Sequence, residues 1–257
     1  MKDLFSLDKK VAIVTGGNGG IGKGIADTFA SVGADVAIVG RNSQKTKAAV
    51  TEIKEAYGVR VIGLQVDVAD EKAVERMAAE VLRELGRIDI LVNNAGINIR
   101  KKPQDYTLEE WERIMAANLT SAFLCSKCVY PTMKAAGGGK IINIGSMATL
   151  FGGALLGPYS ASKGGIVQMS RSMASAWAED NIQVNSILPG WIDTALTRQA
   201  RKDISGLNEK VLARTPCSRW GEPRELGGAA VFLASPASDF ITGVALPVDG
   251  GFSSNIM

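Results

Sequence analysis

Histidine is absent from this 257-residue sequence. Without an imidazole the chain lacks the usual general base of a serine hydrolase, and "IGSMA" has no glycine two residues after the serine, as a nucleophile elbow requires. Zinc sites commonly combine cysteine with histidine, and only three cysteines are present. We therefore expect no hydrolase and no metal site, and we interpret Cys125 and Cys128 as buried residues within a helix.

Long apolar runs and blocks of one charge are also absent. No apolar stretch approaches the roughly 20 residues that a membrane-spanning helix needs, and the first residues lack the pattern of a secretory signal. The 29 basic and 26 acidic residues are spread along the chain, without the basic blocks that bind nucleic acid. We expect a cytoplasmic protein with neither a nucleic-acid nor a membrane partner.

What the sequence does contain is a regular alternation of two kinds of segment. Helical spacing occurs at 21–32, 43–57, 71–85, 108–135, 159–179 and 222–234, between the short apolar runs "VAIVT", "DVAIVG", "VRVIGLQV", "IDILVNN", "KIINIG", "IQVNSIL" and "VALPVDG". Such runs suit strands that are covered on both faces, as in a parallel sheet. The pattern predicts an α/β fold over 1–257, a single-domain, Rossmann-type, doubly wound parallel seven-stranded sheet flanked by helices.

One segment breaks this alternation. Residues of about 194–221 mix charge and glycine, and connections of this length are often functional. Two interpretations stay open for it, a substrate lid and a surface helical hairpin.

A glycine-rich turn follows the first predicted strand. Gly16, Gly20 and Gly22 allow a sharp turn, let a diphosphate approach the backbone, and let the next helix pack against the strand. The start of that helix presents free N–H groups and a positive dipole end. Because a second strand, Asp35 to Val39, completes a βαβ unit, the turn indicates a dinucleotide site.

The end of the second strand bears on the choice of cofactor. An acidic residue there holds the adenosine ribose hydroxyls of NAD(H) and repels a 2′-phosphate. This chain has Gly40, Arg41, Asn42 and Ser43 instead. Because a guanidinium binds phosphate in a fork geometry, we favour NADP(H), with NAD(H) as the alternative.

Tyr159 and Lys163 lie four residues apart and therefore on one face of a helix. The pKa of a phenol is near 10, and an adjacent ammonium ion stabilises the phenolate. Such a phenol can donate a proton to the oxygen of a ketone under reduction, or accept one from an alcohol under oxidation. Ser146 follows the strand "KIINIG", where its hydroxyl can bind the same oxygen.

In this order and spacing the residues resemble the short-chain dehydrogenase/reductase family over essentially the whole chain. The similar pieces are "TGGNGGIG" at 15–22, Asp67, "NNAG" at 93–96, Asn118 in "ANLTSAF", Ser146, "YSASK" at 159–163 and "PGWIDT" at 189–194. The resemblance implies an NAD(P)-dependent oxidoreductase that interconverts a ketone and a secondary alcohol, acts on a small carbonyl or alcohol substrate, and assembles as a homotetramer.

The resemblance also implies roles for individual residues. Asn118, Ser146, Tyr159 and Lys163 would be catalytic, Asp67 would lie beside the adenine, Asn94 near a ribose, and the 189–194 loop along the nicotinamide. With the turn and strand end considered above, the expected cofactor-binding residues are Gly16, Asn18, Gly20, Ile21, Gly22, Arg41, Asn42, Asp67, Val68, Asn94, Ala95, Gly96, Tyr159, Lys163, Pro189, Gly190, Ile192 and Thr194.

The substrate is less closely defined. The stretch "RTPCSRWGEPRELGGAAVFLASPASDFITGVALPVDGGF" looks most like the gluconate 5-dehydrogenase and 2-deoxygluconate dehydrogenase branch, which favours a sugar acid. Two alternatives remain, a 3-oxoacyl-carrier-protein reductase and a non-catalytic NADP(H)-binding sensor. Glu179 and Asp180 would repel an acidic carrier, and the intact catalytic set argues against a sensor. We interpret Arg100, Lys101 and Lys102 as a solvated loop, with reception of a substrate carboxylate as the alternative.

Overall fold

Within residues 2–254, the part of the chain that the computed structural model describes, seven strands form one parallel sheet. Their order is β3-β2-β1-β4-β5-β6-β7, and every neighbouring pair is parallel. The strands are β1 (Val11–Thr15), β2 (Asp35–Gly40), β3 (Val61–Gln65), β4 (Ile90–Asn93), β5 (Gly139–Ile144), β6 (Ile182–Pro189) and β7 (Ala245–Val248). The predicted doubly wound sheet is confirmed, although the predicted unit of 1–257 extends past the described residues at both ends.

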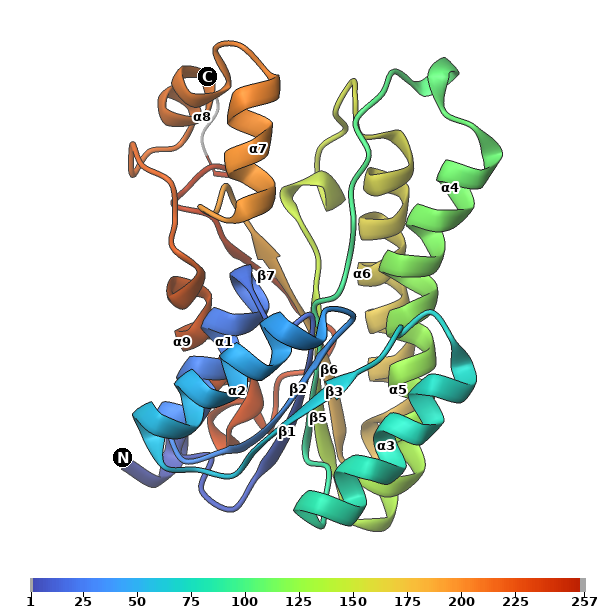
Figure 1. Ribbon diagram of the computed structural model, residues 1–257, viewed down its shortest axis with the longest axis vertical. Coiled ribbons are helices and arrows are strands. Elements are labelled where there is room, and N and C mark those ends of the chain that lie inside the picture. The colour runs from blue at the N-terminus through green and yellow to red at the C-terminus, as the bar shows by residue number, and fades with distance from the viewer. Residues whose placement is uncertain (1, 255–257) are drawn as a thin grey trace.

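Helices cover both faces of the sheet, as Figure 1 shows. One face carries α1 (Gly20–Ser31), α2 (Ser43–Tyr57) and α9 (Gly227–Ala234), which begins after the short turn η6 (Pro223–Leu226). The other carries α3 (Glu71–Leu85), α5 (Ser121–Ala135) and α6 (Gly157–Trp177). Apolar side chains fill both interfaces, such as Phe29 on the first and Val129 on the second, and this burial is the main stabilising contribution.

The predicted helix of 108–135 is interrupted in the structure. It consists of α4 (Leu108–Met115), the π-helical turn η3 (Ala116–Thr120) and α5. A π-turn widens the helix locally and often occurs at functional sites. Here the turn holds Asn118, whose side chain is buried.

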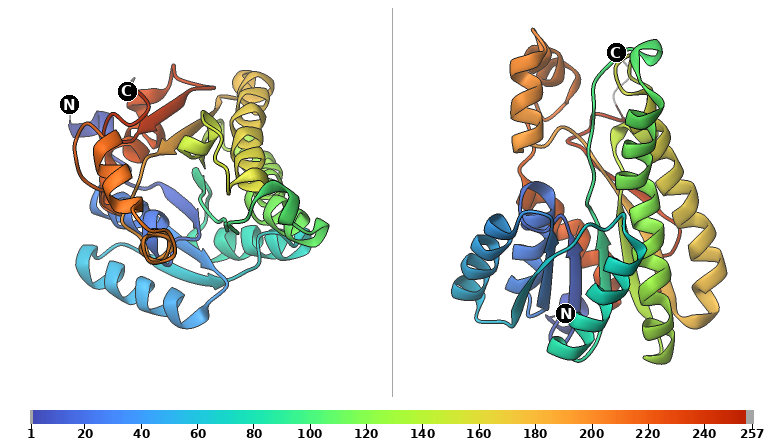
Figure 2. Two further views of the ribbon diagram at one scale, coloured as in Figure 1. Left: turned by 90° about the horizontal axis from the view of Figure 1, so that it is seen from above. Right: turned by 45° about the vertical axis from the view of Figure 1, so that its right-hand side comes forward.

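Two short helices occupy the segment of 194–221, which the sequence left open to two interpretations, a substrate lid and a surface helical hairpin. They are α7 (Ala195–Asp203) and α8 (Leu207–Arg214), and they lie beyond the carboxyl edge of the sheet (Figures 1 and 2). Ala200, Leu207 and Val211 form a small apolar cluster of their own beside Trp191 and Trp220. The pair of helices is therefore attached to the fold by a separate and smaller core.

None of the helices formed by residues 2–254 combines the length and apolar character that a membrane span requires.

Candidate active site

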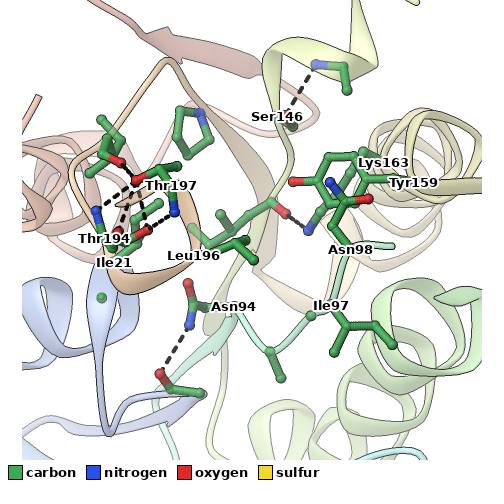
Figure 3. Close-up of a pocket in the computed structure, with 18 of the residues that line it drawn as sticks. Ile21, Asn94, Ile97, Asn98, Ser146, Tyr159, Lys163, Thr194, Leu196 and Thr197 are labelled. Atoms are coloured by element: carbon green, nitrogen blue, oxygen red, sulfur yellow. Dashed lines mark hydrogen bonds between the residues drawn. The ribbon is translucent and has the colours of Figure 1, made fainter. Parts of the chain in front are cut away.

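A cleft of about 860 Å³ opens at the carboxyl edge of the sheet. Its walls come from the β1–α1 turn, the ends of β2 to β6, the start of α6 and the start of α7. The strand order reverses between β1 and β4, and this switch point is where open α/β sheets bind ligands. Figure 3 shows Tyr159, Lys163 and Asn98 together on one side of the cleft and Ile21 and Thr194 on the other.

Asn94 fastens the glycine turn to the neighbouring strand end. Its Nδ2 donates to the carbonyl oxygens of Thr15 at 2.9 Å and Gly16 at 3.2 Å. A Cβ atom at Gly22 would lie 2.4 Å from both Asn94 Nδ2 and the Gly16 oxygen. Gly16 also has a φ of +63°, which favours glycine. These contacts explain why glycine is needed at both positions, although Gly22 does not line the cleft.

The start of α1 is suited to an anion. The N-cap residue Gly19 has no side chain to accept from the first N–H groups, and the first turn contains no acidic residue. These groups therefore keep the partial positive charge of a helix N-terminus. Because Gly19 and Gly20 line the cleft, this end of it fits the diphosphate of a dinucleotide.

The end of β2 supplies two cations and no carboxylate. Arg41 is exposed, and both Arg41 and Lys45 line the cleft. Asn42 does not line it, because its Oδ1 accepts from the Lys45 N–H at 2.9 Å and thereby caps α2. Asn18 Nδ2 donates to Thr46 Oγ1 at 3.0 Å and lies over Gly40. A 2′-phosphate fits this positive corner.

Ser146, Tyr159 and Lys163 meet at the other end of the cleft. Ser146 Oγ accepts from the Ala148 N–H at 3.1 Å, and the Ser146 side chain lies close enough to the Tyr159 phenol to lower its pKa. Lys163 Nζ lies 5.9 Å from the centre of the Tyr159 ring and donates to the Ile144 carbonyl oxygen at 2.7 Å. The serine after β5 and the two helix residues are thus brought together as their spacing predicts.

Burial dominates the electrostatics of this group. It raises the pKa of the Tyr159 phenol above its ordinary value, while the Ser146 hydrogen bond and the Arg100 charge act in the opposite sense. Burial lowers the pKa of Lys163 to about 8. At neutral pH Tyr159 is therefore a phenol that can give up a proton, beside a lysine that is mostly charged.

Asn118 acts beneath the cleft instead of lining it. Its Oδ1 accepts from the Ile97 N–H at 2.7 Å, and its Nδ2 donates to the Ile97 oxygen and to Ser162 Oγ, both at 3.0 Å. Ser162 in turn donates to the Tyr159 carbonyl oxygen at 2.7 Å. Asn118 therefore joins the loop after β4 to the helix that carries Tyr159.

The cleft brings together most of the predicted site residues. Gly22, Asn42 and Asn118 lie behind its wall, in the places described above. Those that line it are Gly16, Asn18, Gly20, Ile21, Arg41, Asp67, Val68, Asn94, Ala95, Gly96, Ser146, Tyr159, Lys163, Pro189, Gly190, Ile192 and Thr194.

Comparison with known proteins decides the family. A family model described as enoyl-(acyl carrier protein) reductase matches residues 16–253. The 2-dehydro-3-deoxy-D-gluconate 5-dehydrogenase of Bacillus subtilis is 42% identical over 254 residues, 99% of this chain and 98% of its own. A short-chain type dehydrogenase/reductase from Mycobacterium marinum is 35% identical with a TM-score of 0.93, over 98% of this chain and 99% of its own. The chain belongs to the short-chain dehydrogenase/reductase family.

A further relative has been solved with ligands. The gluconate 5-dehydrogenase of Burkholderia cenocepacia, in complex with NADP and tartrate, is 38% identical with a TM-score of 0.93 over 99% of each chain. The predicted enzyme class, an NAD(P)-dependent oxidoreductase of the short-chain dehydrogenase/reductase family, is confirmed.

This short-chain dehydrogenase/reductase also has cleft residues that the sequence reasoning did not identify. Lys45, Asn98 and Arg214 line the cleft. Only Lys45 could have been identified from the sequence, since it is a second cation four residues after Arg41 and lies in the first turn of the helix predicted over 43–57. Arg100 was interpreted as part of a solvated loop, but it lines the cleft and its charge acts on Tyr159. Lys101 instead pairs with Glu110 at 2.6 Å.

Cys125 belongs to the core, and the half-buried Cys128 packs against it. Cys125 is fully buried, and burial raises the pKa of its thiol to about 12. The Cys128 thiol donates to the Val74 carbonyl oxygen at 3.7 Å. Thiols held in this protonated state are unreactive, in agreement with the interpretation of both residues as packing.

Proposed function

We propose that the protein interconverts a ketone and a secondary alcohol of a sugar acid with NADP(H). The observation on which this proposal rests is that Ser146, Tyr159 and Lys163 lie together at one end of a cleft of dinucleotide size, the end opposite Arg41. We call it the reacting end. The names of the Bacillus and Burkholderia relatives, which designate sugar-acid substrates, support the substrate class.

Each catalytic residue acts on the substrate oxygen or on a neighbouring residue. The nicotinamide supplies or accepts the hydride. Tyr159 donates its proton to the oxygen during reduction, and the Ser146 hydroxyl holds that oxygen in place. In the opposite direction Tyr159 must be a phenolate, which the Lys163 charge stabilises. Asn118 keeps the start of α6 in position through Ser162.

The cofactor preference rests on charge. Arg41 and Lys45 are the two cations at the end of β2, and no carboxylate lies between Gly40 and Lys45. The Burkholderia relative was solved with NADP. NADP(H) is therefore the cofactor that this corner fits, with NAD(H) bound more weakly because it lacks the 2′-phosphate.

A homotetramer and a substrate lid complete the proposal. Large apolar side chains are exposed on α4 and α5, including Leu108 at 71% and Phe123 at 44%. Exposed apolar groups that gather on neighbouring helices are typical of an interface.

The proposed substrate lid is the segment of about 194–221, whose α7 lines the cleft with Leu196 and Thr197.

The proposal is tested by following NADPH and NADH oxidation with purified protein. The substrates are 5-ketogluconate, a 3-oxoacyl thioester, a cyclic ketone and an aryl ketone. We expect the highest kcat/KM for 5-ketogluconate with NADPH. A higher kcat/KM for the thioester would favour the carrier-linked reductase, and binding of NADPH without reduction or reverse oxidation of any compound would favour the sensor.

A further inference from the structure

Arg214 is an arginine of the cleft wall that the proposed mechanism does not use. It ends α8, and its guanidinium carbon lies 4.3 Å from the centre of the Phe252 ring and 4.9 Å from that of Phe151. It therefore contacts two aromatic rings that come from distant parts of the chain. Cation–π contacts of this kind hold a guanidinium in one orientation without neutralising its charge.

The guanidinium has no anionic partner within residues 2–254, which form neither an ion pair nor a hydrogen bond with it. The neighbouring arginines differ in this respect. Arg198 and Arg201 both pair with Asp193, and Arg219 pairs with Glu225. A half-buried arginine with free N–H donors facing a cleft is an unusual arrangement that favours an anionic ligand.

The aromatic contacts place this charge on the same wall as Ser146. The Phe151 N–H donates to the Met147 carbonyl oxygen at 3.0 Å, so the Phe151 turn follows Ser146 directly. Phe252 packs with Met147 in one buried cluster, to which Phe151 is attached. Arg214 therefore belongs to the reacting end of the cleft and not to the end that holds Arg41.

The charge balance of the cleft supports the same conclusion. Asp67 follows β3, the edge strand next to β2. It is the one acidic side chain among the described residues that line the cleft. The reacting end instead contains Arg100, whose charge acts on Tyr159, and Arg214. Two guanidinium groups at an end of the cleft that no carboxylate of the described residues lines suit a substrate that is itself an anion.

We propose that Arg214 binds the carboxylate of the substrate, held between Phe151 and Phe252 so that its fork faces the cleft. The inference rests on the proposed sugar-acid function and deepens it by assigning the residue that recognises the acid group. A carboxylate bound there joins α8 to the wall that carries Ser146, and thereby orders the segment of 194–221 over the substrate.

The test is a binding measurement on the full-length enzyme saturated with NADPH, a complex in which D-gluconate is not oxidised. Isothermal titration compares D-gluconate with the uncharged polyol D-glucitol. We expect tighter binding of gluconate, and a loss of about tenfold to a hundredfold in gluconate affinity in Arg214→Met. Methionine keeps an apolar contact between the rings. The ratio of gluconate to glucitol affinity is the readout.

Two further variants separate charge from geometry and from folding. Arg214→Lys keeps the charge but loses the planar fork, so its affinity ratio should fall between those of the wild type and Arg214→Met. Lys210→Gln removes an exposed charge from the same helix and should leave the ratio within about twofold of wild type. NADPH fluorescence and thermal unfolding check that each variant is folded.

An unchanged ratio in Arg214→Met, or equal binding of gluconate and glucitol by the wild type, overturns the assignment. If Arg214→Met reduces 5-ketogluconate as well as the wild type does, the proposed function stands and the carboxylate site at Arg214 is overturned. Binding of gluconate through Arg214 by a protein that reduces no ketone would retain the anion site and overturn the proposed function.

Discussion

Lys163 shows how a residue needed for chemistry opposes folding. The residue is 4% exposed, and its ammonium group donates to one backbone oxygen. Burial lowers its pKa to about 8, so the folded protein binds this proton less tightly than the unfolded chain does. The group therefore destabilises the fold at neutral pH, and this effect disappears as the pH rises through about 8 toward the unfolded value of 10.5.

Lys163→Met should abolish turnover and yet stabilise the protein. We expect the free energy of unfolding at pH 7 to rise by up to about 3 kcal/mol, because the pKa difference between 10.5 and about 8 corresponds to that energy. The wild type should gain stability between these pH values, since its unfolded chain then binds a proton that the native state lacks. Urea unfolding at pH 7 and at about pH 10, at one protein concentration, measures both. A less stable variant at pH 7 would contradict this account.

At the scale of a structural element, the turn between β2 and α2 sets the preference for NADPH over NADH. Arg41→Asp removes the cation and adds the carboxylate that holds the ribose hydroxyls of NAD(H). We expect NADPH to bind about tenfold to a hundredfold more weakly and NADH more tightly. Fluorescence titration with both cofactors measures the change.

The control for charge is Lys47→Asp, an exposed position on α2 that does not line the cleft. It makes the same change in net charge and should leave the NADPH to NADH affinity ratio near that of the wild type. A similar loss of NADPH affinity in both variants would mean that overall charge, and not Arg41, sets the preference.

Regular elements were predictable from the sequence because their signals are local. β1, β2, α2 and α3 begin and end where the apolar runs and helical spacing indicated. The π-turn at 116–120 leaves no such mark, since one extra residue in a turn changes neither composition nor amphipathic spacing noticeably. Arg214 was missed for another reason: its significance depends on Phe151 and Phe252, and contacts between distant segments have no local pattern.

At the scale of the whole molecule, the resemblance to the short-chain dehydrogenase/reductase family implies a homotetramer, and the exposed apolar side chains of α4 and α5 mark its expected interface. Light scattering at micromolar concentration should give four times the chain mass of 27.1 kDa. Phe123→Glu places a charge in the expected interface and should reduce the assembly to a smaller species. Tyr57→Glu, at the end of α2, is the matched control and should keep the tetramer. A monomeric wild type would contradict the expectation.

The measurement that tests the central claim most directly is the kcat of Tyr159→Phe with the preferred ketone, together with its dissociation constant for NADPH. The variant lacks only the hydroxyl that donates the proton. The account predicts a kcat lower by about 100-fold or more, with NADPH affinity within a few fold of wild type. Undiminished turnover by Tyr159→Phe would contradict the assignment of Tyr159 as the proton donor.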